Sequence, residues 1–297
     1  MATYHQGSLT VQGRVGVRAQ AEHVGRSIGD GIKPVAAAFL GIQPMLVIGA
    51  ADGEDRIWAS LLTGRPGFVR ATGPRSISVT GGPTEDDPLY GALEGPVGTI
   101  ALDPRTRRRM RLNGTARTTP RGLAVEADEV FANCPKYIQR RDLLAPDATH
   151  PTGAVRRGGH LTPDQERFLR AADTFFIATT ATTATASSGG MDASHRGGNP
   201  GFITVESPSA LSWRDYPGNA MFLTLGNLET DPRAGILVLD WATGDTLQLT
   251  GTARTAFDGT TGERRTRFEI DRTVRADSAS PLRWSPPDCS PANPRLP

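Results

Sequence analysis

One short segment of the second half of the chain carries the side chains best suited to binding an anion. It places the hydroxyl of Ser194, the imidazole of His195 and the guanidinium of Arg196 in a row, followed by Gly197 and Gly198. An arginine fork binds phosphate well, a serine adds a neutral donor, and a glycine pair lets the backbone approach a ligand closely. The segment is a candidate phosphate pocket, although a solvated turn followed by a hairpin explains the same residues about as well.

A second candidate lies in the run from Asn219 to Arg233. We expect an apolar strand that ends at Gly226 and Asn227 and leads into a short helical turn. Backbone amides at such a turn could bind a phosphate or a ring oxygen. The alternative, which the sequence slightly favours, is a tight turn that needs Gly and Asn for a positive φ.

Two further runs are cationic. Residues 105–111 contain five arginines, and their place on a strand after a hairpin favours a solvated face over contact with nucleic acid. Residues 134–141 combine a lysine, a tyrosine and paired arginines. Nothing marks Cys134 as a reactive thiol, so we interpret it as buried or incidental.

Several common active sites are missing from the sequence. It has no GxxxxGK[ST] loop, no GxGxxG between a strand and a helix, and no GxSxG elbow. The five histidines are scattered, without HExxH or a cysteine pair at zinc spacing. The sequence therefore predicts neither a metal site nor a nucleoside triphosphatase nor a serine hydrolase.

Composition limits the partners and the location. The 297 residues include 33 basic and 31 acidic side chains, a formal net charge of +2, which argues against a dedicated nucleic-acid binder. No apolar run approaches the roughly 18 residues that span a bilayer. The first residues lack the pattern of a signal peptide, and two cysteines make no disulfide framework. We therefore expect a cytoplasmic protein without a membrane or nucleic-acid partner.

The chain repeats itself. Residues 59–69 match residues 193–203 at an offset of 134, and residues 99–117 match residues 236–254 at an offset of 137, with Gly-Thr-Ala-Arg identical in both. Two matches in the same order predict a duplicated domain, because the period is too long for a solenoid repeat.

The polar set of the second copy is missing from the first. Where the second copy has His195 and Arg196, the first has Leu61 and Leu62. The serine before them is present in both copies, which suggests a scaffold role for it. We expect one competent site rather than two.

Short β-favouring runs bounded by turn residues dominate both copies. Strands are predicted at 45–48, 175–178, 221–225, 236–239 and 246–250. A helix is predicted from the cap Thr162 through Ala172, with a counterpart that begins at Pro34 and an earlier helix near 17–28. The fold class is mainly β with a few helices (α+β), because short strands close in sequence favour an antiparallel barrel or sandwich.

These patterns divide the chain into five parts. We expect an N-terminal helical extension over 1–34, a first barrel over 35–144, a linker over 145–162, a second barrel over 163–274, and an extended or disordered, proline-rich tail over 275–297.

The order of the motifs resembles that of the pyridoxamine 5′-phosphate oxidase-like, FMN-binding split-barrel flavoproteins. The resemblance rests on residues 192–202, 216–219, 224–228, 231–235, 249–253 and 133–141. Members of that family are six-stranded split barrels that pair as dimers, with FMN in the groove between them. The resemblance therefore implies two tandem split β-barrels that form an intrachain pseudo-dimer, with the flavin between the halves.

The same resemblance assigns residues to the flavin site. It places Ser194, His195, Arg196 and Gly197 near the flavin and its phosphate, Thr224, Gly226 and Asn227 at the strand end that lines the groove, and Lys136, Tyr137 and Gln139 on the other side. Leu228-Glu229-Thr230 replaces a serine-arginine-lysine run of the oxidase proper, so vitamin B6 oxidation is not supported. Residues 81–87 are an insertion that makes the first copy look degenerate.

The leading interpretation is an FMN-binding oxidoreductase of unassigned substrate, with an electron donor such as NADPH or NADH. Arg196 would pair with the phosphate, Ser194 would donate a hydrogen bond, and His195 would handle protons or only bind. The alternatives are deazaflavin or haem as the cofactor, a carrier or sensor without turnover, and a purely structural pseudo-dimer with an empty groove. Further dimerisation of the fused pair stays open.

Overall fold

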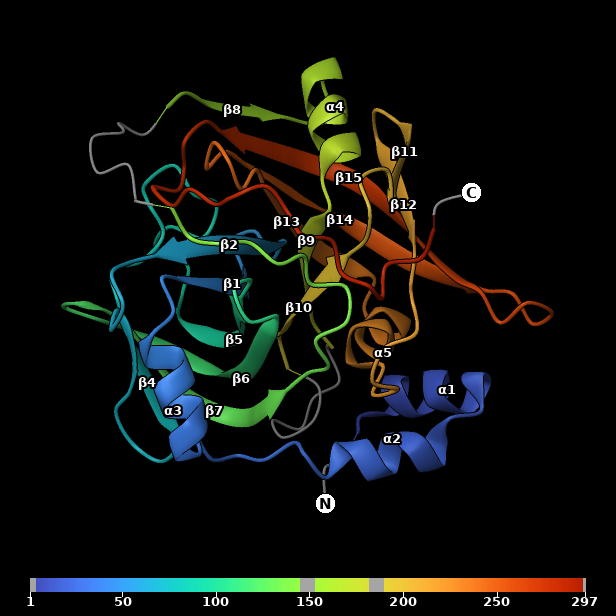
Figure 1. Ribbon diagram of the computed structural model, residues 1–297, viewed down its shortest axis with the longest axis horizontal. Coiled ribbons are helices and arrows are strands. Elements are labelled where there is room, and N and C mark those ends of the chain that lie inside the picture. Colours follow the sequence, from blue (N-terminus) through green and yellow to red (C-terminus); the bar gives the residue numbers. More distant parts are fainter. Residues whose placement is uncertain (1–3, 145–152, 182–189, 296–297) are drawn as a thin grey trace.

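The computed structural model describes residues 4–144, 153–181 and 190–295. Figure 1 shows two β-structures packed together, one from the first half of the chain (blue to green) and one from the second (yellow to red). The helices of the described residues are α1 (Gln6–Val15), α2 (Arg18–Gly25), α3 (Pro34–Gly41), α4 (Pro163–Ala171) and α5 (Leu223–Thr230). The strands of the first unit are β1 (Met45–Ala51), β2 (Ile57–Thr63), β3 (Val69–Ala71), β4 (Ser76–Thr80), β5 (Gly95–Asp103), β6 (Arg108–Thr119) and β7 (Gly122–Ala132). Those of the second are β9 (Thr174–Thr179), β10 (Asp192–Gly197), β11 (Ile203–Ser207), β12 (Ala210–Arg214), β13 (Arg233–Leu239), β14 (Thr246–Phe257) and β15 (Arg264–Ala276), and β8 (Val155–Gly158) pairs with β15.

Both sheets have the same strand order. The first runs β2-β1-β5-β6-β7-β4-β3 and the second β10-β9-β13-β14-β15-β12-β11, all antiparallel in the pairs described. If β9 is taken as the counterpart of β1, and each later strand is matched in turn, the two sheets have the same strand order. The irregularities also agree, because the register shifts directly before Gly114 and before Gly251, the glycines of the repeated Gly-Thr-Ala-Arg. The fold class and the tandem pair are confirmed, with seven strands in the first sheet and eight, β8 included, in the second, rather than six in each.

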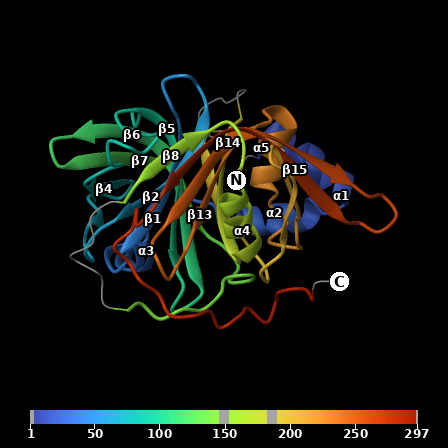
Figure 2. The ribbon, with the colours of Figure 1, turned by 90° about the horizontal axis from the view of Figure 1, so that it is seen from above.

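Each unit has its own apolar core, and a third apolar cluster joins the two units. This cluster brings Val47 and Ala59 of the first unit against Phe176, Ala178 and Leu237 of the second, all at most 1% exposed. It buries the faces of β1, β2 and β5 against those of β9, β10 and β13. Figure 2 shows β1 and β2 beside β13 from above. The two barrels therefore form the intrachain pseudo-dimer that the sequence predicted.

Two glycines mark the symmetry of this seam. A Cβ on Gly98 of β5 would lie 2.5 Å from backbone atoms of Asp192 and Ala193, and a Cβ on Gly235 of β13 would lie 2.5–2.8 Å from Ile57 and Trp58. Gly98 and Gly235 are equivalent positions of the repeat. The same close approach on both sides shows that an approximate twofold relation joins the barrels.

The helix signals of the second copy are confirmed. Thr162 caps α4 with a capping box, in which its hydroxyl accepts from the Gln165 amide and the Gln165 side chain accepts from the Thr162 amide. The counterpart α3 begins at Pro34, and α2 lies within the predicted 17–28. The first helix, α1, has no capping side chain, which explains why the sequence did not reveal it.

The strand predicted over 221–225 is wrong, because these residues begin α5. Phe222 adopts a left-handed conformation with φ 56° and precedes the helix, and residues 223–228 are all buried. The helix is covered by α1 and by strands β9, β10 and β14, so residues 223–228 have no solvent-facing side. An apolar run without helical periodicity looks like a strand when the covering elements are unknown.

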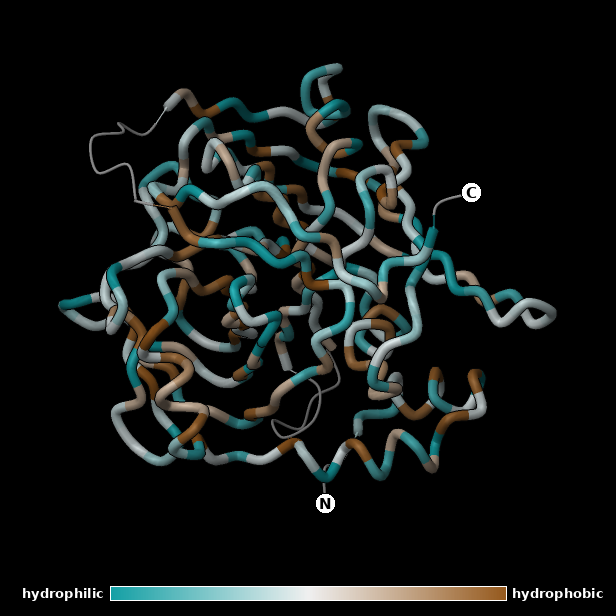
Figure 3. The backbone as a smooth tube through the Cα atoms, in the orientation of Figure 1, coloured by the Kyte–Doolittle hydropathy of each residue, from teal (hydrophilic) through white to brown (hydrophobic). Residues whose placement is uncertain are grey.

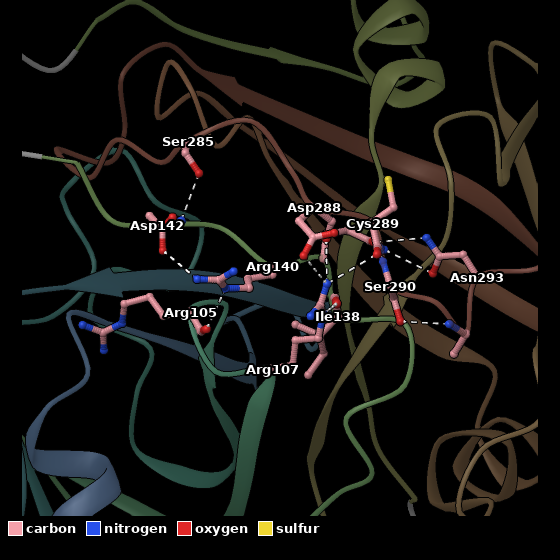
Figure 4. Close-up of polar contacts among 12 residues, drawn as sticks. Arg105, Arg107, Ile138, Arg140, Asp142, Ser285, Asp288, Cys289, Ser290 and Asn293 are labelled. Carbon is pink, nitrogen blue, oxygen red and sulfur yellow. Dashed lines mark hydrogen bonds and ion pairs between the residues drawn. The ribbon is translucent and has the colours of Figure 1, made fainter.

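Of the two expectations for the C-terminal segment, an extended or a disordered tail, the described residues show an extended one, and it packs against the seam. Trp284 is 2% exposed, and its backbone bridges to Leu143. Figure 4 shows the polar contacts of this segment, including the Arg140 amide that donates to the Asp288 carbonyl at 2.8 Å and the Arg107 guanidinium on the Asp288 carboxylate at 3.1 Å. The predicted linker lies outside the described residues over 145–152, and part of the remainder forms β8.

Hydropathy follows this arrangement. Figure 3 shows hydrophilic tips on the two long hairpins, β6–β7 and β14–β15, that project from opposite ends of the molecule. None of the helices in the described ranges is long and apolar enough to cross a membrane. In the same ranges, no cluster of three or more His, Cys, Asp or Glu side chains is placed to hold a metal ion.

Candidate functional site

A polar pocket lies at one end of the seam, where the two barrels and the N-terminal side of α5 meet. Arg109 and Arg111 reach it from β6 of the first barrel, and residues 194–197 of β10 reach it from the second. Lys136 and residues 214–225 complete the wall. The cavity has a volume of about 100 Å³.

A buried ion pair joins the two barrels at the floor of this pocket. The Arg111 guanidinium contacts the Asp192 carboxylate, and both side chains are at most 5% exposed. Asn113 donates to Asp192 at 3.2 Å, and the Thr224 hydroxyl donates to it at 3.5 Å. Because Asp192 is satisfied by these donors, the floor offers an incoming anion no competing free carboxylate.

His195 is held in its neutral form with a known tautomer. Arg109 Nη1 lies 2.8 Å from His195 Nδ1, and a guanidinium can only donate, so Nδ1 accepts and the ring proton sits on Nε2. Nε2 is buried and has no partner among the described residues. Burial, followed by the charges of Arg109, Arg196 and Arg141, lowers the pKa of His195 well below 6.5. His195 is therefore arranged as a hydrogen-bond donor, and a proton-carrying role near neutral pH is not favoured.

Arg109 is the least compensated charge of the pocket. No described carboxylate lies within ion-pair distance of it, and its Nε is buried without a partner. Burial, followed by the charge of Arg196, lowers the pKa of Arg109 to about 10. A buried cation without an anion is costly, and a bound anion would relieve that cost.

Arg196 lies at the more open side of the pocket, with its side chain 20% exposed. Its Nε donates to Asp215 at 3.1 Å and its Nη1 to the Ser194 hydroxyl at 3.0 Å. Asp215 also accepts from Arg264 at 3.3 Å. Arg196 is thus fixed in place by neighbours, and its Nη2 stays available to a ligand.

Aromatic side chains and residues with positive φ line the opening of this pocket. The rings of Tyr137 and Tyr216 lie 5.3 Å apart, and the Tyr137 hydroxyl donates to the Pro217 carbonyl at 2.9 Å. Tyr137, Ala220 and Phe222 have positive φ, three of the six non-glycine residues that do so in the described ranges. Each such residue costs on the order of 1–3 kcal/mol, and their clustering at one pocket points to a functional site.

The structure brings seven of the ten predicted site residues to this pocket. They are Lys136, Tyr137, Ser194, His195, Arg196, Gly197 and Thr224, and Cys134 also lines it. Gly197 allows two backbone segments to approach closely, since a Cβ there would lie 2.1 Å from the Tyr137 carbonyl oxygen.

Three predicted residues do not line the pocket. Gly226 lies under α1, where a Cβ would meet Ser8 at 2.4–2.6 Å, and Asn227 donates to Thr179 at 3.1 Å. Gln139 is buried and accepts from the Ser290 amide at 2.8 Å. These residues position α5 and the C-terminal segment rather than a ligand.

Sequence reasoning missed Arg109 and Arg111. The prediction of a solvated face is wrong for these two positions, although Arg108 is exposed. Their spacing of two residues, which puts them on one face of a strand, was the available signal. Which face would be buried depends on the second barrel, which the local sequence does not reveal.

The equivalent place in the first copy is closed by its own side chains. Gln248, the counterpart of Arg111, donates to the Ser60 hydroxyl at 3.0 Å and to Asp87 at 3.1 Å. The Ser60 hydroxyl also donates to Asp87 at 2.6 Å. Burial raises the pKa of Asp87, which comes from the inserted loop. An uncharged side chain and a buried carboxyl thus occupy the space that the cationic pocket leaves open on the other side.

Comparison with known proteins adds to this description. No family model matches the sequence, and no curated protein sequence matches it. Among solved structures, a protein of the pyridoxinephosphate oxidase family from Clostridium acetobutylicum, related to general stress protein 26 of B. subtilis, is 8% identical with a TM-score of 0.29, and the match covers 41% of this chain and 91% of that one. This match concerns the fold alone.

Two other similar structures come from Vibrio cholerae and from Group A Streptococcus. HutZ, the haem storage protein from Vibrio cholerae, is 12% identical with a TM-score of 0.29, over 39% of this chain and 93% of its own. HupZ from Group A Streptococcus is 10% identical with a TM-score of 0.28, over 37% and 90%. Each match takes nearly all of the other chain and about two fifths of this one. At these identities the likeness concerns the fold alone.

The depressed pKa of His195 predicts a pH dependence of stability. Below about 6.5 the unfolded chain protonates this histidine while the folded protein does not, so the free energy of unfolding falls as the pH drops from about 7, by up to about 1.4 kcal/mol per pH unit. Above about pH 7 this contribution is constant. Urea unfolding of the wild type and of His195→Gln between pH 5 and 8 measures it as the difference in slope, and equal slopes would contradict it.

Proposed function

We propose that this chain binds FMN, with the phosphate in the pocket at the seam and the ring at its mouth. The observation that carries the proposal is the partly buried guanidinium of Arg109, which has no described carboxylate partner and lies beside the neutral donor His195. Arg196 and Lys136 add positive charge on the same pocket. Such a set of donors is suited to a phosphate, which accepts from several guanidinium and neutral N–H groups at once.

The size of the cavity decides which end of the cofactor it can take. About 100 Å³ suits a phosphate group and is well below the 300–1,000 Å³ typical of a whole ligand. We therefore propose that the ring lies outside the cavity against Tyr137 and Tyr216, whose rings are half-buried and whose edges are fixed. Haem is less suitable, because a porphyrin would have to reach the enclosed Nε2 of His195 directly.

The protein would contribute binding and electrostatics rather than an acid or base. When bound, FMN supplies hydride and electron transfer. Arg109 and Arg196 would bind and orient the phosphate, Ser194 would hold the Arg196 fork, and Nε2 of His195 would donate a hydrogen bond. We propose an oxidoreductase that takes electrons from NADPH or NADH in the cytoplasm and passes them to a small molecule. A carrier that binds flavin without turnover uses the same contacts.

The absorption spectrum of the purified protein tests the proposal. We expect a yellow protein with oxidised-flavin bands, or an apoprotein that takes up added FMN. Bleaching by NADPH or NADH under anaerobic conditions would distinguish an enzyme from a carrier. A Soret band would identify a haem protein instead. A colourless protein that ignores FMN would refute the proposal.

Arg196→Ala tests the rim of the site. Loss of one charge-assisted hydrogen bond to the phosphate should weaken FMN binding by about 1.5–3 kcal/mol, measured by fluorescence titration. Leu62→Ala at the equivalent position of the first copy is the matched control. Leu62 is 3% exposed in the first core, so that change should lower stability and leave FMN affinity unchanged. Unchanged affinity in Arg196→Ala would remove Arg196 from the site.

A further inference from the structure

A second and much larger cavity shares no lining residue with the pocket at the seam. It has a volume of about 940 Å³ and is enclosed by α4, the ends of β13 and β15, β8 and the C-terminal segment. Trp241 and Trp284 form one wall, with their rings 5.7 Å apart and nearly perpendicular. Its size lies within the range of small-molecule sites, and the FMN proposal does not use it.

Several residues that line this cavity carry buried hydrogen-bonding atoms without a partner. Thirteen buried side-chain atoms of the described residues have no partner, and six of them belong to residues that line it. The six are Nε and Nη1 of Arg141, Nε1 of Trp241, Oγ1 of Thr273, Nη1 of Arg275 and Nε1 of Trp284. Five of the six are N–H groups, which can only donate. Each unmet donor costs about 1–3 kcal/mol, so the lining calls for an acceptor-rich ligand.

Charge favours the same kind of ligand. Five arginines line the cavity, against three aspartates whose carboxylates already have partners. The arginines are Arg141, Arg156, Arg157, Arg167 and Arg275. Arg141 is 5% exposed at its side chain and uses only Nη2, on Asp173 at 2.5 Å. The other four arginines are also ion-paired, Arg167 with Asp164 and the other three with carboxylates outside the lining: Arg156 with Asp277, Arg157 with Asp86 and Arg275 with Asp245. The attraction for an anion therefore rests on the N–H groups that these pairs leave unused on Arg141 and Arg275.

The aromatic side chains add an apolar part to the recognition. The Arg141 guanidinium lies 4.8 Å from the Trp241 ring centre, and that of Arg275 lies 3.9 Å from the ring centre of Phe168 on α4. Each of these guanidinium groups stacks on an aromatic ring and keeps N–H groups without a hydrogen-bond partner, at Nε and Nη1 of Arg141 and at Nη1 of Arg275. A flat cation with a free edge binds phosphate while the neighbouring rings cover an apolar group.

We propose that this cavity is a binding site for a phosphorylated small molecule with an aromatic part, of nucleotide size. The phosphates would accept from Arg141, Arg275 and Thr273, and the indole N–H groups would donate to the remaining oxygens. The C-terminal segment completes the site, since Trp284 and residues 285–287 line it. This explains why the segment is fixed by the contacts that Figure 4 shows. The proposal does not depend on FMN binding at the seam.

Tryptophan fluorescence and calorimetry with ADP, pyrophosphate and adenosine test the proposal on the full chain. Two of the four tryptophans lie in the cavity, while Trp58 and Trp213 lie in the barrel cores. We expect ADP to bind saturably and quench the fluorescence, pyrophosphate to bind more weakly, and adenosine to give no measurable heat. The quenching should vanish in Trp241→Phe/Trp284→Phe and persist in Trp213→Phe.

Conservative variants locate the binding. Arg141→Lys keeps a cation for the buried Asp173 but removes the free N–H edge, so ADP should bind about tenfold more weakly. Trp284→Phe removes one donor and keeps a ring, for about a fivefold loss. Arg196→Ala, in the seam pocket, should bind ADP as the wild type does. Absence of ADP binding at millimolar concentration would overturn the proposal, and so would binding that survives Arg141→Lys but is lost in Arg196→Ala.

Discussion

Replacing Arg109 by glutamine is expected to weaken FMN binding by about 3 kcal/mol, roughly 150-fold, while the protein becomes more stable. The guanidinium has no described carboxylate partner, and its one side-chain contact is the Nδ1 of His195. In the free protein it is an uncompensated, partly buried charge, so its removal should raise the free energy of unfolding by about 1 kcal/mol. Titration with FMN and urea unfolding measure the two effects.

The neighbouring arginine provides the matched control. Arg108 precedes Arg109 on β6 and is exposed. Arg108→Gln removes the same charge from the opposite face of the strand, so it should change neither FMN affinity nor stability measurably. If Arg109→Gln instead destabilised the protein and left the affinity intact, Arg109 would be a structural residue and the proposed phosphate site would be lost.

Arg111→Met is expected to lower the free energy of unfolding by about 3–5 kcal/mol. It leaves Asp192 buried with only Asn113 and the more distant Thr224 as donors. Breaking a buried pair costs more than the pair contributes, because one charge stays uncompensated. Asp192 lies on β10 and Arg111 on β6, so the loss should loosen the contact between the barrels. Chemical unfolding of the variant measures the loss.

A double-mutant cycle separates the interaction between Arg111 and Asp192 from the other contacts of the two side chains. Arg111→Met combined with Asp192→Leu removes both charges and should recover most of the stability. The exposed pair of Arg267 and Glu206, with side chains 52% and 34% exposed, is the control, and Arg267→Met should cost at most about 1 kcal/mol. A double variant as unstable as the single one would show that these positions matter for shape and not for charge.

Local sequence signals were sufficient for the elements that depend on local chemistry. The capping box at Thr162 predicts α4, and the proline at position 34 predicts the start of α3. The repeated Gly-Thr-Ala-Arg marks equivalent β-strands whose register shifts at the same glycine. The physical reason is that caps, turns and bulges are satisfied by neighbouring residues, so their signals stay readable without the rest of the fold.

Elements that depend on distant partners were predicted less well. The run 221–225 looked like a strand because its apolar residues have no polar face, and only the cover by α1 makes a fully buried helix possible there. The C-terminal segment looked extended or disordered because its proline-rich sequence hides Trp284, which finds its place against Trp241.

The sequence alone determined that two related β-units follow each other, and that only the second carries the Ser194-His195-Arg196 set. Alternation, turn residues and internal repetition encode this, since each acts within one unit. The tertiary structure alone decided that Arg109 and Arg111 complete the pocket, and that Gln248 and Asp87 close its counterpart. A pocket at a seam takes its charge from both barrels, so the sequence of one unit cannot reveal which arginines become buried and which stay exposed to solvent.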